Sequence, residues 1–242
     1  IIQEDITHLA IIHHETSTGL LNDLSKIAKL CKDHDVTLLV DAMSSFAAIP
    51  IDMVNDEIPF LAASSNKNLE GVPGISFVLA NHQALDHISD YPKRTLYLDL
   101  YDQYQHFKDT GQFRFTPAIQ CLYALEKAVA LIEKEGIKHR YNRYKKRWTQ
   151  LISGLRQLGY KTVLADDLSG QLISPIQFPD IPQFSFDKLH DFLYEKLITI
   201  YPGKLSDYPC FRVSSIGQLT EKDIEHVINA FKEFQKAYKI KL

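Results

Sequence analysis

A single lysine stands at the end of an apolar run and is surrounded by turn-forming residues. The run Phe60 to Ala63 is followed by Ser64-Ser-Asn-Lys67, and the turn Gly71-Val-Pro-Gly74 leads into a second apolar run, Ile75 to Leu79. We expect Lys67 to lie on a loop where a buried strand leaves its sheet, because the proline of the turn excludes a helix there. Ligands bind at such strand ends in open α/β sheets. A lysine that is partly desolvated there can attack a carbonyl carbon with its free amine, although most lysines on loops are ordinary surface residues.

An aspartate ends a second predicted strand. The apolar run Val36 to Val40 leads into Asp41-Ala-Met-Ser-Ser45. An aspartate in such a place is commonly a helix cap or a turn residue. A lysine and an aspartate on neighbouring strand ends are, however, the pair that pyridoxal 5'-phosphate (PLP) chemistry needs, because the lysine holds the cofactor as a Schiff base and the aspartate keeps the pyridine nitrogen protonated. Class I aldolases also use a Schiff-base lysine, so the pair by itself leaves both reactions open.

Three polar loops follow three predicted strands in the first half of the chain. The expected strands are His8 to Ile12, Val36 to Val40 and Ile58 to Ala63, and the spacing of apolar residues indicates a helix from Leu24 to His34. Strands that alternate with helices and end in polar loops are typical of a doubly wound α/β sheet that is mostly parallel. The loops that we expect to meet at the carboxyl edge of this sheet are Glu15 to Thr18, Asp41 to Ser45 and Ser64 to Lys67.

The second half of the chain follows a different pattern. Thr116 and Pro117 suit the cap and first turn of a long helix that runs up to Gly136, and a second helix is expected from Arg140 to Leu158. We place a domain boundary near Gly136, between residues 1–136 and a smaller carboxyl-terminal α/β domain of residues 137–242. The elements expected after the second helix are strands at 161–164, 172–178, 198–201 and 210–213 and helices at 186–196 and 221–237.

The bulk composition excludes several classes of protein. The 242 residues carry a formal net charge of -3, whereas nucleic-acid-binding proteins usually carry a concentrated basic excess. The three cysteines are widely spaced and the ten histidines lack metal-ligand spacing, which fits a protein without disulfides or metal in a reducing cytosol. No apolar run has the length of a membrane span and no signal peptide is visible, so we expect no membrane partner. The chain begins Ile1-Ile-Gln, without methionine, as the middle of a longer protein would.

Taken together, the motifs resemble those of class V aminotransferases, a family of PLP enzymes of fold type I. The aspartate and lysine motifs are general to this family, whereas the Tyr-Pro-Gly-Lys and Asp-Leu-Tyr segments narrow the resemblance to the branch that uses 2-aminoethylphosphonate and pyruvate. The resemblance runs almost from end to end but lacks the family's amino-terminal portion, which carries a phosphate-binding loop and the residue that stacks on the pyridine ring. The segments that carry it are His13-His-Glu-Thr-Ser-Thr-Gly-Leu-Leu-Asn22, Val40-Asp-Ala-Met-Ser-Ser-Phe46, Ser64-Ser-Asn-Lys67 with Gly71-Val-Pro-Gly74, Arg94-Thr-Leu-Tyr-Leu-Asp-Leu-Tyr101, Arg114-Phe-Thr116, Ile200-Tyr-Pro-Gly-Lys204 and Cys210-Phe-Arg-Val213.

This resemblance implies that residues 1–136 are the remainder of a large PLP-binding domain. It also implies roles for four residues around the cofactor. Lys67 would form the Schiff base and act as the proton-transfer base, and Asp41 would pair with the pyridinium nitrogen. Thr16 would hydrogen-bond the phenolic oxygen of the cofactor, and Asn66 would lie near its phosphate. The implied cofactor is PLP, with no metal.

The same resemblance implies a partner subunit and a substrate site. Thr116 would reach a phosphate in the neighbouring subunit's site, which implies a homodimer. Arg212 would bind the acid group of the substrate through a forked, charge-assisted pair, and Arg94 is an additional candidate for contact with an anionic substrate. The implied reaction moves the amino group of 2-aminoethylphosphonate to pyruvate and gives phosphonoacetaldehyde and alanine, in the cytoplasm.

Three alternatives remain at this point. Another class V aminotransferase, of the alanine–glyoxylate or serine–pyruvate type, would keep the fold and the cofactor but use a different amino donor. Ala47-Ala48 and Ser214-Ser215 differ from the usual residues of the family, which could narrow the substrate pocket. A catalytically silent, truncated domain would act only in folding or at a dimer interface. A lysine-dependent aldolase would need a barrel of eight strand–helix units, which the pattern after Gly136 does not supply.

Overall fold

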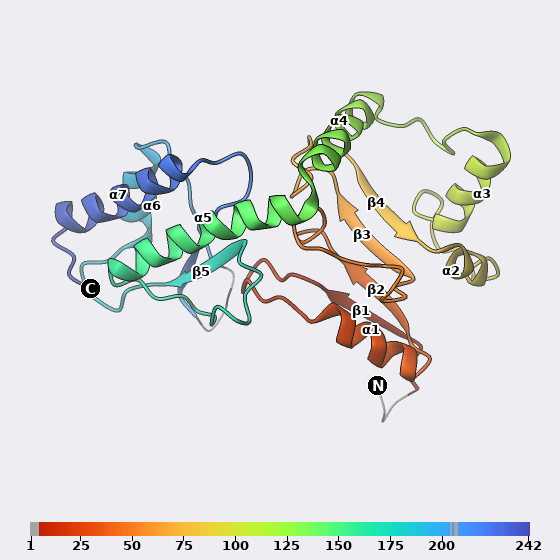
Figure 1. The fold of residues 1–242 in the computed structure, drawn as a ribbon, viewed down its shortest axis with the longest axis horizontal. Helices are drawn as coiled ribbons and strands as arrows, with labels where there is room; N and C mark the ends of the chain where they lie inside the picture. The colour runs from red at the N-terminus through yellow and green to blue at the C-terminus, as the bar shows by residue number, and fades with distance from the viewer. Residues whose placement is uncertain (1–4, 204, 206–207) are drawn as a thin grey trace. The chain divides into compact units, whose positions relative to one another are not determined.

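The computed structural model describes residues 5–203, 205 and 208–242, and Figure 1 shows its helices and strands. The contacts between residues divide the chain into two compact units. The first unit comprises the residues up to His13 together with Asp23–Lys134, and the second comprises His14–Asn22 together with Glu135–Leu242. The chain passes from the first unit to the second beside Gly136, where the sequence places a domain boundary. The assignment of these units as domains stays a prediction.

The first unit is built on a sheet of four strands whose spatial order follows the sequence (Figure 1): β1 (His8–Ile12), β2 (Thr37–Asp41), β3 (Phe60–Ser64) and β4 (Ser76–Ala80). The first three strands are parallel, and β4 is antiparallel to β3. A parallel pair needs a crossover, which α1 (Leu24–Asp33) provides between β1 and β2. Asp23 caps this helix by accepting a hydrogen bond from the main-chain nitrogen of Lys26 at 3.2 Å. The predicted α/β class with a mostly parallel sheet is confirmed.

Helices cover one face of this sheet. Leu38 of β2 and Leu61 of β3, which are 2% and 1% exposed, pack in one apolar cluster with Ala28 of α1. The helix α4 (Ile119–Glu135) contributes Ile132 to a second, smaller cluster, against which Phe77 of β4 packs. Both clusters lie on the same face, because neighbouring side chains on a strand alternate between the faces and Phe77 belongs to both clusters.

The connection from β3 to β4 is a folded turn and carries the lysine motif. Ser65 lies at its base, where its hydroxyl donates to the carbonyl oxygen of Val72 at 2.6 Å and its own carbonyl accepts from the main-chain nitrogen of Gly71 at 2.9 Å. A Cβ on Gly71 would lie 2.8 Å from that Ser65 oxygen, so this position requires glycine. The turn is therefore held from inside by a buried serine.

The helices between β4 and α4 are α2 (His82–His87) and α3 (Leu100–Thr110). Asp99 caps α3 by accepting from the main-chain nitrogen of Asp102 at 2.8 Å, and Gly111, with φ of 67°, ends it. None of the residues of α3 is buried in this chain. The sequence pattern in this region predicts no helix, because α3 has no buried apolar face from which to read a period.

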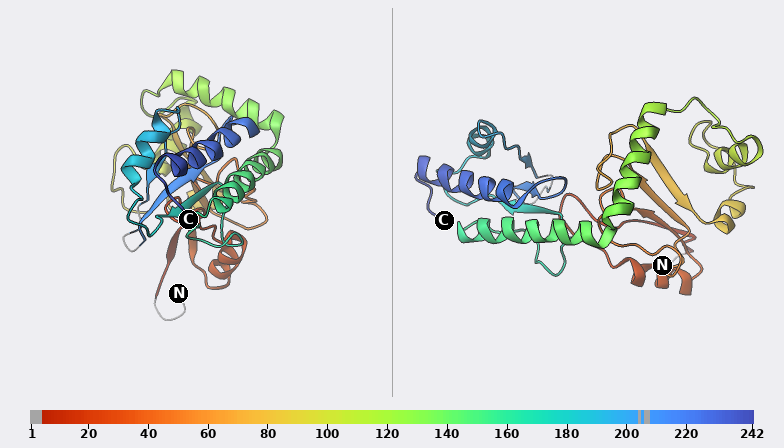
Figure 2. Two further views of the ribbon diagram at one scale, coloured as in Figure 1. Left: turned by 90° about the vertical axis from the view of Figure 1, so that its left-hand side faces the viewer. Right: turned by 45° about the horizontal axis from the view of Figure 1, so that its top comes forward.

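The second unit is a small antiparallel sheet with three helices. The sheet has the order β5 (Ile173–Gln177), β7 (Cys210–Ser214), β6 (Tyr201–Pro202), and the helices are α5 (Ile137–Gln157), α6 (Phe186–Tyr194) and α7 (Glu221–Ala237). The helices α5 and α7 lie side by side in both views of Figure 2. They approach closely at Gly154, where a Cβ would lie 2.4 Å from Cδ1 of Ile228. No helix in the described part of the chain has the length and apolar character of a membrane span.

Two predicted strands of the second unit are wrong, for identifiable reasons. Residues 161–164 form an isolated bridge between Thr162 and Ile176 rather than a strand. The ladder cannot continue because Pro175, to which Val163 donates, has no N–H to return a bond. Residues 198–200 are not a strand either, since the main-chain nitrogen of Ile198 bonds the carbonyl oxygen of Leu193 and so closes the end of α6.

The start of the long helix also differs from the prediction. The helix α4 begins at Ile119, and the carbonyl of Ala118 accepts its first hydrogen bond, from the main-chain nitrogen of Leu122 at 3.0 Å. Thr116 and Pro117 therefore lie in the irregular segment before the helix and do not cap it. This leaves the exposed Thr116 side chain outside the helix.

Candidate active site

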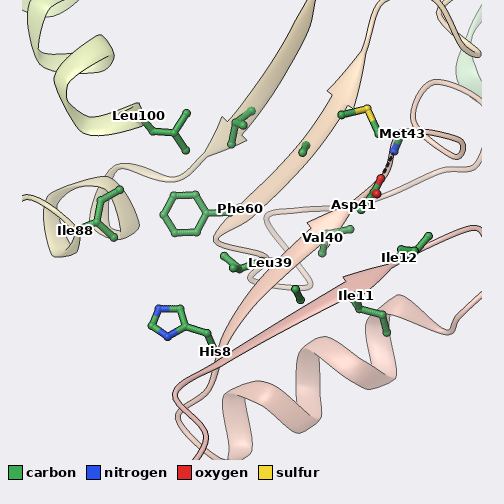
Figure 3. A pocket seen from close by; sticks show the side chains of 13 residues that line it. His8, Ile11, Ile12, Leu39, Val40, Asp41, Met43, Phe60, Ile88 and Leu100 are labelled. Carbon is green, nitrogen blue, oxygen red and sulfur yellow. Dashed lines mark hydrogen bonds between the residues drawn. The ribbon is translucent and has the colours of Figure 1, made fainter. Parts of the chain in front are cut away.

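Asp41 is the last residue of β2. In the register of the sheet it lies between Ile12 of β1 and Ala62 of β3. Because Val40 points into the core with α1, the Asp41 side chain lies on the opposite face, where it is exposed. Its Oδ1 accepts a hydrogen bond from the main-chain nitrogen of Met43 at 2.8 Å, as drawn in Figure 3. The main chain thus holds a carboxylate at the carboxyl end of a central strand.

Lys67 lies on the turn after the neighbouring strand, β3, as the sequence predicts. Its carbonyl accepts from the main-chain nitrogen of Glu70 at 2.9 Å, which closes a turn at this point. The Asn66 and Lys67 side chains are exposed, whereas Ser65 and Asn68 on either side of them are buried. The lysine amine is therefore presented by a turn with buried ends, and the described residues of this chain do not desolvate it.

A buried network joins the ends of β1, β2 and β3. At the end of β1, the main-chain nitrogen of His13 donates to the carbonyl of Asp41 at 2.9 Å. The ring of His13 is hydrogen-bonded through Nδ1 to the Ser45 hydroxyl at 3.0 Å. After β3, the Asn68 side chain donates to the carbonyl of Ser44 at 2.9 Å. His13, Ser45 and Asn68 are 4%, 0% and 2% exposed. The loop that begins at Asp41 is thus fixed from one side by His13 and from the other by the residue that follows Lys67.

Removal of the Asn68 side chain tests this network. We expect Asn68→Ala to lower the free energy of unfolding of the first unit by about 1–3 kcal/mol, because it removes a buried side chain and its hydrogen bond to the Ser44 carbonyl. Asn66→Ala is the matched control and should change stability by less than about 0.5 kcal/mol, since Asn66 is exposed. Urea unfolding of the protein without cofactor measures both values. Equal stability of the two variants would show that the Asn68 bond does not hold the turn.

Thr16 lies in the segment of the second unit between His14 and Asn22. This segment is a tight loop in which the main-chain nitrogen of Gly19 donates to the carbonyl of Glu15 at 2.7 Å. Gly19 has φ of 78°, and a Cβ there would lie 2.6 Å from the carbonyl oxygen of Ile173, so only glycine lets the loop pack against β5. Thr16 is half-buried on this loop.

Glu15, next to Thr16, accepts two hydrogen bonds from Ser17. The main-chain nitrogen and the hydroxyl of Ser17 each donate to Oε1 at 2.8 Å. The main-chain donor is the largest influence and lowers the pKa of the Glu15 carboxyl; burial opposes it, and the Ser17 hydroxyl lowers it further. Electrostatic interactions with His14 and Arg212 also lower this pKa. The Glu15 carboxyl therefore interacts electrostatically with Arg212, a residue of the same unit.

Arg212 lies in the middle of β7, the central strand of the small sheet. It pairs with Pro175 of β5 on one side and with Tyr201 of β6 on the other. The side chain is half-buried, and its buried Nε has no hydrogen-bond partner among the described residues. A guanidinium donor without a partner is suited to an anion from outside the chain.

The structure brings some of the predicted residues together. Asp41, Asn66 and Lys67 belong to the first unit and lie at the ends of two adjacent parallel strands, and Thr116 belongs to the same unit. Thr16 and Arg212 belong to the second unit. The additional candidate Arg94 is exposed between α2 and α3, and Lys204, the last residue of the Tyr-Pro-Gly-Lys segment, lies outside the described residues.

His13, Ser45 and Asn68 are the residues that sequence reasoning misses. His13 and Ser45 stand within the quoted motifs and Asn68 directly follows Lys67, and these positions are the available signal. Sequence does not show which of the polar residues in a motif turn inward, because that depends on carbonyl groups supplied by distant segments.

Comparison with known proteins gives the family. The profile of the family described as Aminotransferase class-V matches residues 1–226. A protein of Vibrio cholerae serotype O1 described as 2-aminoethylphosphonate–pyruvate transaminase is 39% identical over 227 residues, which are 93% of this chain and 62% of that protein. A protein of the same description from Klebsiella pneumoniae is 38% identical over 234 residues, or 95% of this chain and 64% of that protein. The chain thus spans somewhat less than two thirds of the length of these relatives.

Solved structures with this fold include two other aminotransferases. Pyridoxamine–pyruvate aminotransferase from Mesorhizobium loti superimposes with a TM-score of 0.88 at 20% identity, and the match covers 97% of this chain and 61% of that one. Ureidoglycine–glyoxylate aminotransferase from Bacillus subtilis gives a TM-score of 0.85 at 20% identity, with 96% and 61% covered. At this identity the likeness shows the fold, and it agrees with the predicted fold type I.

Proposed function

The chain belongs to the class-V aminotransferase family, and from this we propose that it supplies the catalytic strand ends of a PLP-dependent transaminase that moves the amino group of 2-aminoethylphosphonate to pyruvate. The observation that carries the proposal is an exposed lysine and an exposed aspartate at the ends of two adjacent parallel strands. The choice of substrates is supported by the 38–39% identity to proteins described as 2-aminoethylphosphonate–pyruvate transaminases.

The residues present fit the two reactive ends of PLP. The amine of Lys67 suits the aldehyde, and the carboxylate of Asp41, which is held at the strand end by the main chain of Met43, suits a protonated ring nitrogen. When bound, PLP supplies an electron sink for the bond that breaks at the substrate carbon. The exposed amide of Asn66, beside Lys67, is the group on this turn that would bind the phosphate of the cofactor.

Each residue has a separate task in this proposal. Lys67 would hold the cofactor, and its amine would move a proton at the substrate carbon that carries the amino group. Asp41 would pair with the ring nitrogen, and the network of His13, Ser45 and Asn68 holds the loop that begins at Asp41. Thr16 would donate its hydroxyl to the phenolic oxygen of the cofactor.

Arg212 is the proposed anchor for the acid group of the substrate. Its buried Nε lacks a hydrogen-bond partner among the described residues, so a phosphonate or carboxylate oxygen would satisfy a donor that is otherwise costly to bury. Glu15 lies near enough to Arg212 for the charge of the arginine to contribute to the lowered pKa of the Glu15 carboxyl. Both substrates are small molecules, 2-aminoethylphosphonate first and pyruvate second, and the products are phosphonoacetaldehyde and alanine.

We further propose that the protein acts as a homodimer in the cytoplasm. The segment around α3 and the start of α4 exposes large apolar side chains, among them Leu96, Tyr97, Phe107, Phe113 and Tyr123, which suits burial against a second subunit. Thr116 lies in the same segment, where it could reach the phosphate in the partner's site. The free thiols of Cys31, Cys121 and Cys210 fit a reducing compartment.

The half-reaction tests the proposed donor. When PLP-loaded protein is mixed with 2-aminoethylphosphonate alone, we expect the visible absorbance of the lysine-bound cofactor to be replaced by that of the aminated cofactor, with one equivalent of phosphonoacetaldehyde. Serine serves as the comparison donor and should react at least about 100-fold more slowly, because its amino group lies one carbon closer to the acid group that Arg212 binds than in 2-aminoethylphosphonate. A faster reaction with serine would assign the protein to another branch of the family.

A further inference from the structure

Arg212 lies between two unlike neighbours in the small sheet of the second unit. In the register of the strands, Pro175 of β5 is opposite Arg212 on one side and Tyr201 of β6 is opposite it on the other. Residues directly opposite each other on antiparallel strands place their side chains on the same face, with Cβ atoms about 4.5–5.5 Å apart. Pro175 has no polar side chain, whereas the hydroxyl of Tyr201 can donate a hydrogen bond. Of these two neighbours, Tyr201 is therefore the one that can share a polar ligand with the arginine.

The side chains of Tyr201 and Arg212 lie on the face of the sheet that is turned away from the apolar core. Phe211 and Val213, on either side of Arg212 in β7, belong to the core cluster of the second unit and are 0% and 5% exposed. Since neighbouring side chains on a strand point to opposite faces, Arg212 points away from this cluster, and Tyr201 does the same as its partner in the register. Tyr201 is 61% exposed, so its hydroxyl is accessible to a ligand.

The main chain of β6 is held close against β7. The main-chain nitrogen of Gly203 donates to the carbonyl of Cys210 at 2.7 Å. A Cβ on Gly203 would lie 2.1 Å from the Sγ of Cys210, so this close approach requires glycine. Pro202, between Tyr201 and Gly203, has its φ fixed by its ring. The backbone of this segment therefore holds Tyr201 in place beside Arg212.

A phosphonate and a carboxylate offer different numbers of oxygens to such a pair of residues. A guanidinium can bind two oxygens of either group through two parallel hydrogen bonds. The Nε of Arg212, which has no hydrogen-bond partner among the described residues, and a terminal nitrogen of the same side chain form such a pair of donors. A carboxylate then has no oxygen left, whereas a tetrahedral phosphonate has a third one. A further donor beside the arginine therefore favours a phosphonate.

We propose that Tyr201 is a specificity-determining residue, whose hydroxyl donates a hydrogen bond to the third oxygen of a phosphonate that Arg212 binds through the other two. This inference rests on the proposed role of Arg212, and it adds the group that distinguishes the phosphonate of the amino donor from the carboxylate of pyruvate. Hydrogen bonds to charged groups are stronger than those between neutral groups, so loss of this hydroxyl weakens phosphonate binding about tenfold or more.

A binding experiment without PLP tests this inference separately from transamination. The probes are ethylphosphonate and propanoate, which share an ethyl group, differ in the acid group and carry no amino group to transfer. Dissociation constants are measured by NMR titration of the isotope-labelled chain, and the Nε–H signal of Arg212 is assigned by its loss in Arg212→Lys. Tyr201→Phe removes the hydroxyl alone. Tyr194→Phe, at a position of α6 that is 66% exposed, is the matched control, and circular dichroism checks that the variants fold.

We expect Tyr201→Phe to raise the dissociation constant of ethylphosphonate at least about tenfold and that of propanoate less than about twofold, whereas Tyr194→Phe changes neither by more than about twofold. In the PLP-loaded protein, Tyr201→Phe should raise the KM for 2-aminoethylphosphonate to a similar extent and leave the KM for pyruvate within about twofold. Unchanged phosphonate binding, or equal weakening of both probes, would overturn the role of Tyr201 and leave the proposed transamination in place. Failure of the unsubstituted chain to bind either probe would overturn this role together with the proposed anchoring by Arg212.

Discussion

Asp41→Asn is expected to lower the turnover of the PLP-loaded protein by about a hundred- to a thousand-fold. The substitution keeps an oxygen that can accept from the main-chain nitrogen of Met43, so the strand end should retain its structure. It removes the negative charge that holds a proton on the ring nitrogen, and without that proton the cofactor is a poorer electron sink. The loss should appear in the rate of the half-reaction with 2-aminoethylphosphonate, and little of it in the stability of the free protein.

Asp52→Asn is the matched control for this prediction. Asp52 is an aspartate of the same unit that also accepts a hydrogen bond from a main-chain nitrogen, that of Asn55 at 3.0 Å, but it lies in a different turn. Its replacement should leave turnover within about twofold. If Asp41→Asn retained full turnover, Asp41 would not be the partner of the ring nitrogen, and the proposed cofactor site would be wrong.

Phe211→Ala is expected to lower the free energy of unfolding of the second unit by about 3–5 kcal/mol. Phe211 is 0% exposed and precedes Arg212 on β7. Its ring lies within 5.9–6.3 Å of the rings of Phe231, Tyr160 and Phe178, measured between centroids. Removal of the ring leaves a cavity among these aromatic residues and loosens the strand that carries Arg212.

The single tryptophan reports on this change. Trp148 belongs to the same apolar cluster as Phe211, so its fluorescence follows the unfolding of the second unit. Tyr208→Ala, at a position that is 57% exposed, is the control and should change the free energy of unfolding by less than about 0.5 kcal/mol. A similar, small effect of both substitutions would mean that the aromatic cluster does not stabilise the small sheet.

Much of the fold follows from local sequence signals. The strand β1 and the helix α7 have the predicted bounds. An uninterrupted apolar run marks β1, and a Thr220–Asp223 capping box marks the start of α7. Strand prediction failed where the outcome depended on distant partners. Residues 161–164 have a strand-like composition, but the strand needed a donor that Pro175 lacks.

In the candidate site, too, some features can be predicted from the sequence and others cannot. The positions of Asp41 and Lys67 at adjacent strand ends are predictable, since each follows a short apolar run and precedes turn residues. The bonds of His13 to Ser45 and of Asn68 to the Ser44 carbonyl are not predictable, because each joins segments more than twenty residues apart. The exposure of Lys67 also differs from the partly desolvated lysine that the sequence suggests, because the described residues leave its turn uncovered.

The measurement that tests the central claim most directly is PLP titration followed by borohydride reduction and peptide mass mapping. It is made on the chain and on its Lys67→Arg variant. The account predicts a visible absorbance band and a phosphopyridoxyl label confined to Lys67, with Lys67→Arg giving neither. Absence of the band, or a label scattered over surface lysines such as Lys26 and Lys32, would contradict it.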